Sequence, residues 1–239
     1  MQTHTNNALV RRRLRVSLVY LSASLAFLLG GFIFSAAQTD VLIQYVVSLP
    51  ALIIGLLLWA RNQGYLERWG PRGRQDAILA RSLRGLDARY HLFAFPDSGL
   101  PDYLIIGPMG VLVLVPRALT GTVACYDDRW HHDDGRQPVQ RVLGWFSARA
   151  SLGNPTADVQ GAMQATYRYL GGRLDQEILE RVRVDGLVVL THPRVELSMH
   201  GCPVPALLIK SLRGHIRRLP KVLTPSQLAE VLDALPGED

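Results

Sequence analysis

An acid and a base stand at the two ends of an apolar stretch in the middle of the chain. Asp102 opens this stretch, Gly107-Pro108-Met109-Gly110 interrupts it, and Arg117 closes it. Phosphodiester hydrolysis needs a divalent cation that polarises the phosphate and acidifies a water molecule, and carboxylates hold Mg²⁺ in near-octahedral geometry. The position where a second carboxylate belongs holds Val115. The stretch predicts two buried strands laid out as a metal-dependent nuclease core with one metal-binding group missing.

Arg117 also differs from the base that such a site uses. Arginine stays protonated because its pKa lies above about 12, whereas the pKa of a lysine can be tuned downward. Pro116 removes a backbone N–H from the strand. Arg117 can still bind a phosphate through bidentate hydrogen bonds. The segment Val115-Pro116-Arg117 therefore favours phosphate contact over metal catalysis.

Simpler interpretations of these charged residues stay open. Asp102 follows Pro101, so it also fits a turn. Asp76 fits the first turn of a helix, where the helix macrodipole favours an acid. Arg117 also fits a solvated strand end. His131-His132-Asp133-Asp134 holds metal-ligand residue types, but adjacent strand residues point in different directions, so we expect a solvated turn there.

A basic helical face is predicted near the C-terminal end. It consists of Lys210, Arg213, His215, Arg217, Arg218 and Lys221, on an amphipathic helix predicted at 205–219. Such a face could contact nucleic acid or anionic lipid, or it could be a plain solvated surface. We take Lys210, Arg213, Arg217 and Arg218, together with Arg117, as candidate nucleic-acid-binding residues.

Two uncharged apolar runs precede the soluble part of the chain. Residues 16–36 and 41–60 each reach the length of about 20 apolar residues that a helix needs to cross a bilayer. Only a short link around Gln38-Thr39-Asp40 separates them, which predicts a tight helical hairpin. A cleaved signal peptide ending at Ser35-Ala36-Ala37 is disfavoured, because the run is long and a second span follows at once. Small residues expected to line the helix contact are Ser22, Ala26, Gly30, Ala51 and Gly55.

The basic excess of the chain lies beside these runs. The net charge is +6, and residues 1–74, with eight arginines and two acids, account for all of it. The link between the runs has no Lys or Arg, so the positive-inside rule predicts a two-pass membrane protein with both termini in the cytoplasm. Residues 75–239 are neutral overall, so the basic balance is no sign of nucleic-acid binding. It instead sets topology and attracts anionic lipid.

Four parts follow from this pattern. Residues 1–15 form a basic cytoplasmic N-terminus, 16–60 the transmembrane hairpin, 61–74 a juxtamembrane linker and 75–239 a cytoplasmic α/β domain with a mixed central sheet. We expect residues 1–10 to be frayed. Within the domain, hydrophobic periodicity and turn residues predict helices at 75–87, 155–171, 174–181, 205–219 and 225–235, and strands at 90–95, 102–107, 111–116, 121–126, 129–131 and 184–191.

Two cysteines, Cys125 and Cys202, lie far apart in the sequence and have no CxxC partner. In a cytosolic domain they are expected to stay reduced. No zinc motif or disulfide framework is visible, so we predict no resident metal or cofactor.

The element order resembles the nuclease-related domain family (NERD), which belongs to the restriction-endonuclease-like fold. The resemblance covers about residues 73–191. Asp76 stands where that family has a helical Glu, and Asp102 where it has a strand Asp. The later landmarks that match are Gly107-Pro108-Met109-Gly110-Val111, Gly121, Trp130 and Asn154-Pro155. The family's Glu-x-Lys reads Val115-Pro116-Arg117 here, so the resemblance implies a degenerate active site with Asp76, Asp102 and Arg117 as remnant catalytic positions.

Three hypotheses follow. The first is a bacterial-type membrane protein whose nuclease-related domain has lost metal catalysis and holds nucleic acid, or serves as an interaction module, at the cytoplasmic membrane face. The second is an active Mg²⁺-dependent nuclease, in which Asp127, Asp128 or Asp158 supplies the missing carboxylate. The third is a structural membrane scaffold that recruits an unknown protein partner. Mg²⁺ is implied only by the second.

Overall fold

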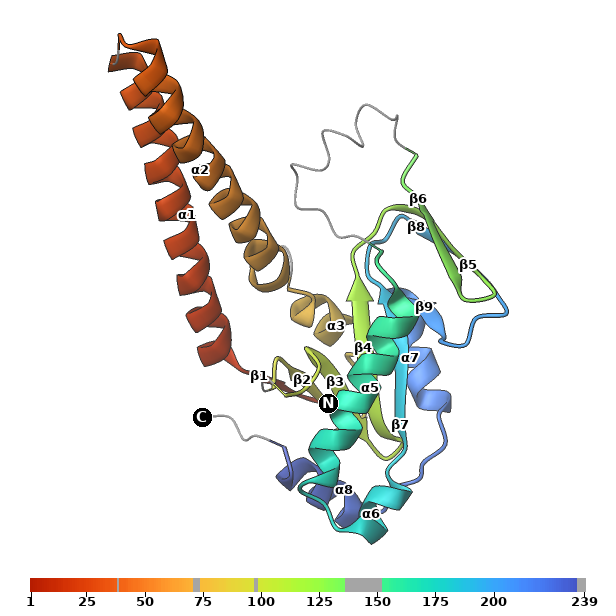
Figure 1. Cartoon of the computed structure of the whole chain (residues 1–239). Helices are drawn as coiled ribbons and strands as arrows, with labels where there is room; N and C mark the ends of the chain where they lie inside the picture. The colour runs from red at the N-terminus through yellow and green to blue at the C-terminus, as the bar shows by residue number, and fades with distance from the viewer. Residues whose placement is uncertain (38, 71–73, 97–98, 136–151, 236–239) are drawn as a thin grey trace. The chain divides into compact units, whose positions relative to one another are not determined.

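The computed structural model describes residues 1–37, 39–70, 74–96, 99–135 and 152–235 (Figure 1). The chain divides into two compact units, and each is described by itself. Asn7–Arg74 belong to a helical hairpin unit, whereas Met1–Asn6 and the described residues from Gln75 onward form an α/β unit. The α/β unit therefore takes its first six residues from before the hairpin.

Two long apolar helices form the hairpin unit. They are α1 (Asn7–Ala37) and α2 (Val41–Trp69), and both are long and apolar enough to cross a membrane. Asp40 caps α2, because its Oδ1 accepts the backbone N–H of Leu42 at 2.9 Å. The predicted hairpin is present, although α1 starts and α2 ends well outside the predicted range of 16–60.

Small and polar residues line the contact between α1 and α2. Ser17, Ser24 and Gly31, each seven residues apart, are buried on α1. The Ser17 hydroxyl donates to Asn62 Oδ1 at 2.6 Å, and a Cβ added at Gly31 would lie 3.1 Å from Ala51 Cβ. The prediction that Ser22, Ala26 and Gly30 line the contact is wrong, because these three residues are exposed. The seam follows a seven-residue repeat, as in left-handed helix pairs.

A six-stranded main sheet forms the centre of the α/β unit. Its strand order is β1-β2-β3-β4-β7-β9. The central strand β3 (Tyr103–Gly107) is antiparallel to β2 (His91–Ala94) and to β4 (Gly110–Arg117). The other pairs are parallel. They are β4 with β7 (Val184–Leu190), β7 with β9 (Ala206–Leu208), and β1 (Gln2–Thr5) with β2. The predicted mixed sheet is confirmed.

The start of the chain is ordered in this sheet. We expected residues 1–10 to be frayed, which is wrong, because β1 pairs with β2 in the register Gln2↔His91. The His4 ring stacks on Phe93, with 4.7 Å between ring centroids. A short polar strand whose partner lies far along the chain gives no periodicity signal.

A three-stranded small sheet, in the order β6-β5-β8, stands beside the main sheet. The strands are β5 (Gly121–Tyr126), β6 (Arg129–Asp133) and β8 (Val195–His200). Asp127 and Asp128, both with positive φ, make the predicted turn between β5 and β6. Gly121, also at positive φ, has no room for a side chain, because a Cβ would collide with the Asp133 carbonyl oxygen.

The described residues of the α/β unit also form the helices α3 (Asp76–Ser82), α5 (Pro155–Gly171), α6 (Gln176–Arg181), α7 (Ile209–Arg218) and α8 (Pro225–Asp233). The helix predicted at 75–87 stops at Ser82, shortly before Gly85 at a φ of +88°. The helix predicted at 205–219 starts at Ile209, because Ala206–Leu208 pairs with β7 instead.

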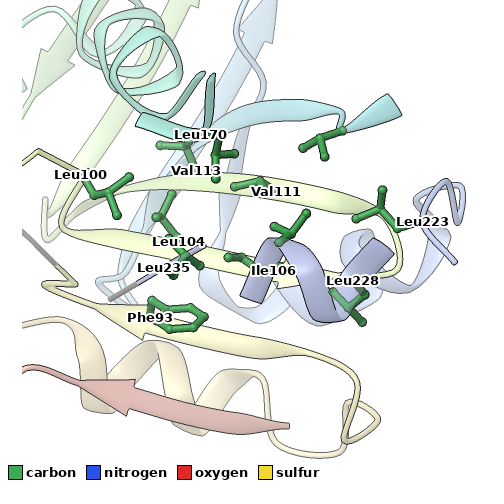
Figure 2. Packing of buried hydrophobic residues seen from close by; sticks show 12 residues of the cluster. Phe93, Leu100, Leu104, Ile106, Val111, Val113, Leu170, Leu223, Leu228 and Leu235 are labelled. Carbon is green, nitrogen blue, oxygen red and sulfur yellow. The ribbon is translucent and has the colours of Figure 1, made fainter. Parts of the chain in front are cut away.

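Apolar side chains cover both faces of the main sheet. On one face, Leu104, Ile106, Val111 and Val113 form a cluster with residues of α5 and α8 (Figure 2). On the other face, the hydroxyl of Tyr103 accepts the backbone N–H of Gln75 at the start of α3. Helix α7 packs against α3. The result is a three-layer α/β/α arrangement.

Cys125 and Cys202 form a disulfide, with 6.3 Å between their Cα atoms. The prediction of two separate reduced thiols is therefore wrong for this structure. Strand β8, which the sequence did not predict, pairs in parallel with β5 and leads directly to Cys202. The bond thus joins β5 to the segment that connects β8 with β9.

Candidate functional site

The end of β4 holds Val115 and Arg117, the two residues expected from the sequence to replace a carboxylate and a base. Val115 lies opposite Val188 of β7 and packs against an apolar cluster that includes Val159 of α5. Two positions on, the guanidinium of Arg117 forms an ion pair with the carboxylate of Asp158, which lies in the first turn of α5. The Arg117 side chain is 24% exposed. A phosphate would have to compete with Asp158 for this arginine.

Asp102 lies at the same end of the sheet. The backbone N–H of Phe95 donates to the Asp102 carbonyl at 2.7 Å, which continues the β2–β3 ladder by one step. The β3–β4 register pairs Leu104 with Val113, so its extension places Asp102 opposite Val115. Cross-strand partners share one face of a sheet. The structure therefore brings the position of Asp102 next to the end of β4.

Asp76 is placed differently. It is the first residue of α3 and is buried. The preceding residue, Gln75, donates its N–H to the hydroxyl of Tyr103 at 3.0 Å. Because Tyr103 and Leu104 are consecutive strand residues, they point to opposite faces. Asp76 therefore belongs to the helix on the face opposite Val115.

A chain of hydrogen bonds fixes the start of α5. The indole N–H of Trp130 donates to the hydroxyl of Thr156 at 2.9 Å, and that hydroxyl donates to the carboxylate of Asp128. Asn154 caps the helix through the N–H of Ala157. The sequence marked Trp130 and Asn154 separately, but no signal in it showed that their elements meet. These bonds position Asp158 beside Arg117.

Asp127, Asp128 and Asp158 were the candidates for supplying the missing carboxylate, and each now has a partner or a place in a turn. Asp158 pairs with Arg117, Asp128 accepts from Thr156, and Asp127 has a positive φ in the β5–β6 turn. His132 Nε2 lies 2.8 Å from the Thr120 carbonyl oxygen. Among residues that the structure describes, no group of three or more His, Cys, Asp or Glu side chains is arranged to hold a metal ion.

The basic face of α7 meets the end of α3. Arg213 donates from Nη1 to the carbonyl oxygen of Arg84 at 2.8 Å, and Arg217 from Nη2 to that of Gly85 at 2.6 Å. Leu212 and Ile216 are buried on the opposite side of α7. The exposed cations Arg84, Lys210, Arg213, Arg217 and Arg218 are called the arginine surface below.

This surface keeps its positive charge. The carbonyl oxygens bound by Arg213 and Arg217 carry no net charge, and α7 contains no acidic residue. A guanidinium has five N–H donors, so each arginine has donors left for a phosphate. Burial and the nearby Arg218 lower the pKa of His215 below its ordinary value of 6.5, an effect that Asp185 partly opposes.

Comparisons of the chain with protein-family models, with curated proteins and with solved structures found no match. The functional argument therefore depends on the residues and geometry of this chain.

Proposed function

We propose that this chain is a membrane-anchored protein whose nuclease-related α/β domain lacks metal catalysis and holds nucleic acid at the cytoplasmic membrane face. The observation that carries the proposal is the contrast within the domain. A packed valine stands at the position where the nuclease-related pattern has a carboxylate, while five exposed cations gather on α7 and on the turn that follows α3.

The arrangement of elements supports a nuclease-related frame. The order α3, β2, β3 led by Asp102, β4, α5 and β7 follows the order on which the family resemblance is based. Trp130 and the start of α5, which are two landmarks of that resemblance, are joined through Thr156. The restriction-endonuclease-like fold is part of the proposal.

The surroundings of Val115 argue against hydrolysis. A Mg²⁺ site needs converging oxygen ligands, whereas Val115 contributes methyl groups to an apolar cluster. Arg117 cannot lose a proton at neutral pH. With Val115 and Arg117 at these positions, the domain can still contact phosphate but lacks the groups that would activate water.

Phosphate binding is proposed for the arginine surface. Two of its arginines are already oriented by carbonyl oxygens of the α3 end, so less side-chain freedom is lost when they bind a ligand. Contacts from Lys and Arg to phosphates supply sequence-independent, salt-dependent affinity. Such binding suits a holding role and needs no base-specific contact.

Chain connectivity supports a two-pass topology. Strand β1 precedes α1 directly and α3 follows α2, so one α/β unit is covalently attached to both ends of the hairpin. Both ends must then lie on the same side of a membrane. The arginines that flank the apolar runs favour the cytoplasmic side.

Binding of labelled DNA tests this proposal on the full chain in detergent micelles. A fragment that starts at residue 75 would lack β1 and is unsuitable. Single-stranded and duplex oligonucleotides are titrated by fluorescence anisotropy at several salt concentrations, with Mg²⁺ or Mn²⁺ present in a parallel cleavage assay. We expect salt-dependent binding without cleavage. Absence of binding at low salt would refute the holding role.

The active-nuclease alternative has its own readout. Cleavage that disappears in Asp102→Ala would show that the frame still catalyses hydrolysis. If wild type does not cleave, a double replacement of Val115→Glu and Arg117→Lys asks whether the frame is otherwise intact. Cleavage by that variant alone would identify these two positions as the missing chemistry.

A further inference from the structure

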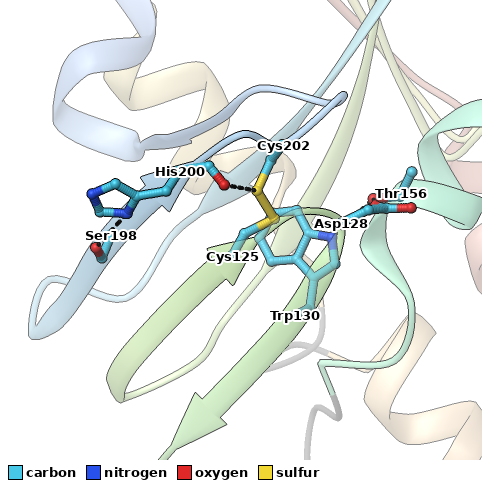
Figure 3. The surroundings of a disulfide bond; sticks show 7 residues. All are labelled: Cys125, Asp128, Trp130, Thr156, Ser198, His200 and Cys202. Atoms are coloured by element: carbon cyan, nitrogen blue, oxygen red, sulfur yellow. Dashed lines mark hydrogen bonds between the residues drawn. A yellow bond between two sulfur atoms is a disulfide. The ribbon is translucent and has the colours of Figure 1, made fainter.

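The Cys125–Cys202 disulfide joins a buried sulfur to an accessible one. Cys125 is fully buried in β5, whereas Cys202, after β8, is only half-buried (Figure 3). The chain contains two cysteines, so the pair has no competitor for disulfide formation. An attacking thiol can reach the bond from the Cys202 side.

The surroundings accommodate the reduced pair as well. A buried cysteine thiol behaves as a small apolar side chain, which suits Cys125 in the interior of β5. The sulfur of Cys202 lies 3.5 Å from the carbonyl oxygen of His200, which can accept a hydrogen bond from a thiol at that position. The fold therefore has a place for both the bonded and the reduced sulfurs.

We propose that Cys125 and Cys202 form a reversible thiol–disulfide site that exchanges with a dithiol reductant. A thiolate of the reductant attacks Cys202 Sγ, the S–S bond breaks, and Cys125 leaves as a thiolate that takes up a proton. The second reductant thiol then displaces Cys202 and closes the reductant's own disulfide. Two electrons and two protons pass to the cysteines, and the reductant is oxidised.

Reversibility follows from the location of the domain and so rests on the proposed function. Disulfides are rare in the cytosol and, where present, are mostly transient or redox-sensing. A bond placed at the cytoplasmic membrane face would be in contact with a reducing thiol pool. If the domain were instead outside the cytoplasm, the same bond would be permanent.

The redox state of the disulfide can affect the start of α5 through a chain of contacts. Cys125 lies directly opposite Trp130 in the β5–β6 register, and Figure 3 shows the indole beside the disulfide. Trp130 binds Thr156 in the first turn of α5, two residues before Asp158, the partner of Arg117. Release of Cys202 removes the covalent restraint on the segment that follows β8. Reduction should therefore loosen the packing of Trp130 and of the α5 start.

Counting free thiols tests the site in the purified full chain. The protein in lipid nanodiscs is treated with or without a dithiol, quenched in acid, denatured and labelled with a maleimide that shifts its mass. After oxidation we expect no label, and after native reduction two labels, with renewed oxidation restoring the unlabelled form. Two labels that persist after oxidation, or a bond that a dithiol reduces only after denaturation, would overturn the proposal.

Tryptophan emission supplies a second measurement, because a disulfide quenches an adjacent indole. Reduction should raise the emission of wild type, and Trp130→Phe should abolish this rise while retaining the change in thiol labelling. Cys202→Ser should give one label and high emission regardless of reductant. An unchanged emission of wild type on reduction would contradict the contact between the bond and Trp130.

Sidedness separates failure of this proposal from failure of the proposed function. In intact cells, a membrane-impermeant maleimide should not label the cysteines even after a permeant reductant, whereas permeabilised cells should show labelling of the accessible Cys202. Labelling from outside would refute the cytoplasmic location. A pair that is protected from outside but stays fully bonded in growing cells would refute exchange alone.

Discussion

Arg117 and the arginines of α7 form two cationic groups whose surroundings differ. Arg117 faces the carboxylate of Asp158, which neutralises it. Arg213 and Arg217 face backbone carbonyl oxygens, which orient the guanidinium groups and leave their charge in place. The difference shows that Arg117 is less available for phosphate than the two arginines of α7. The positively charged surface lies on α7 and on the turn after α3, on another face of the domain.

The largest effect is expected when the arginine surface loses two charges. Arg213→Gln with Arg217→Gln should weaken DNA binding roughly tenfold or more and reduce the salt slope of log K by about 2, close to 0.9 per lost phosphate contact. Anisotropy titrations at several salt concentrations measure both. The matched control, Arg168→Gln with Arg194→Gln, removes two exposed arginines outside the surface and should bind nearly as wild type. Equal losses in both variants would mean that only total charge matters.

A smaller effect of opposite sign is expected when Arg117 is released. Asp158→Asn removes the neutralising carboxylate, so DNA affinity should rise several-fold and the salt slope should steepen by about 1. Arg117→Gln alone should change binding little, and the double variant should return to the wild-type value. A large loss of affinity in Arg117→Gln would show that phosphate already displaces Asp158 in the wild type.

The N-cap of α5 should stabilise the start of the helix that carries Asp158. Asn154→Ala should lower the free energy of unfolding by about 1 kcal/mol, because the N–H of Ala157 loses its acceptor. Asn154→Asp should keep this acceptor and stay near wild type. Denaturant unfolding of the α/β unit measures both changes. A destabilised Asn154→Asp variant would indicate that side-chain charge, and not capping, determines the stability.

The smallest effect concerns His215. Because its pKa is lowered in the folded state, the unfolded chain takes up the proton first as the pH falls. Its contribution to stability is thus present above the ordinary value of 6.5 and is lost below it. Wild type should lose more stability than His215→Gln between pH 7.5 and pH 5.5, by less than about 1.4 kcal/mol per unit of pKa shift. Identical pH profiles would contradict a lowered pKa.

The sequence predicted the elements whose signals are local. β3 and β4 are continuous apolar runs around a Gly-Pro-Met-Gly turn, and α5 begins at Asn154-Pro155 and ends near two glycines. β1 and β9 were missed because they are short, and β8 was missed because its partner β5 lies far back in the sequence. For the site, the position of Arg117 was predicted but its partner was not. The bonds from Arg213 and Arg217 reach 129 and 132 residues back along the chain, which no local pattern reveals.

The order in which this chain is synthesised gives β1 a further consequence. Gln2–Thr5 leaves the ribosome before both apolar helices, and its partner His91–Ala94 leaves after them. In the two-pass topology proposed above, the main sheet gains its outer strand only after both spans have inserted and returned the chain to its starting side. Insertion of a single span would then leave the two strands on opposite sides of the bilayer, with β2 as an open edge. The proposed topology therefore makes completion of the sheet depend on correct membrane insertion during biogenesis.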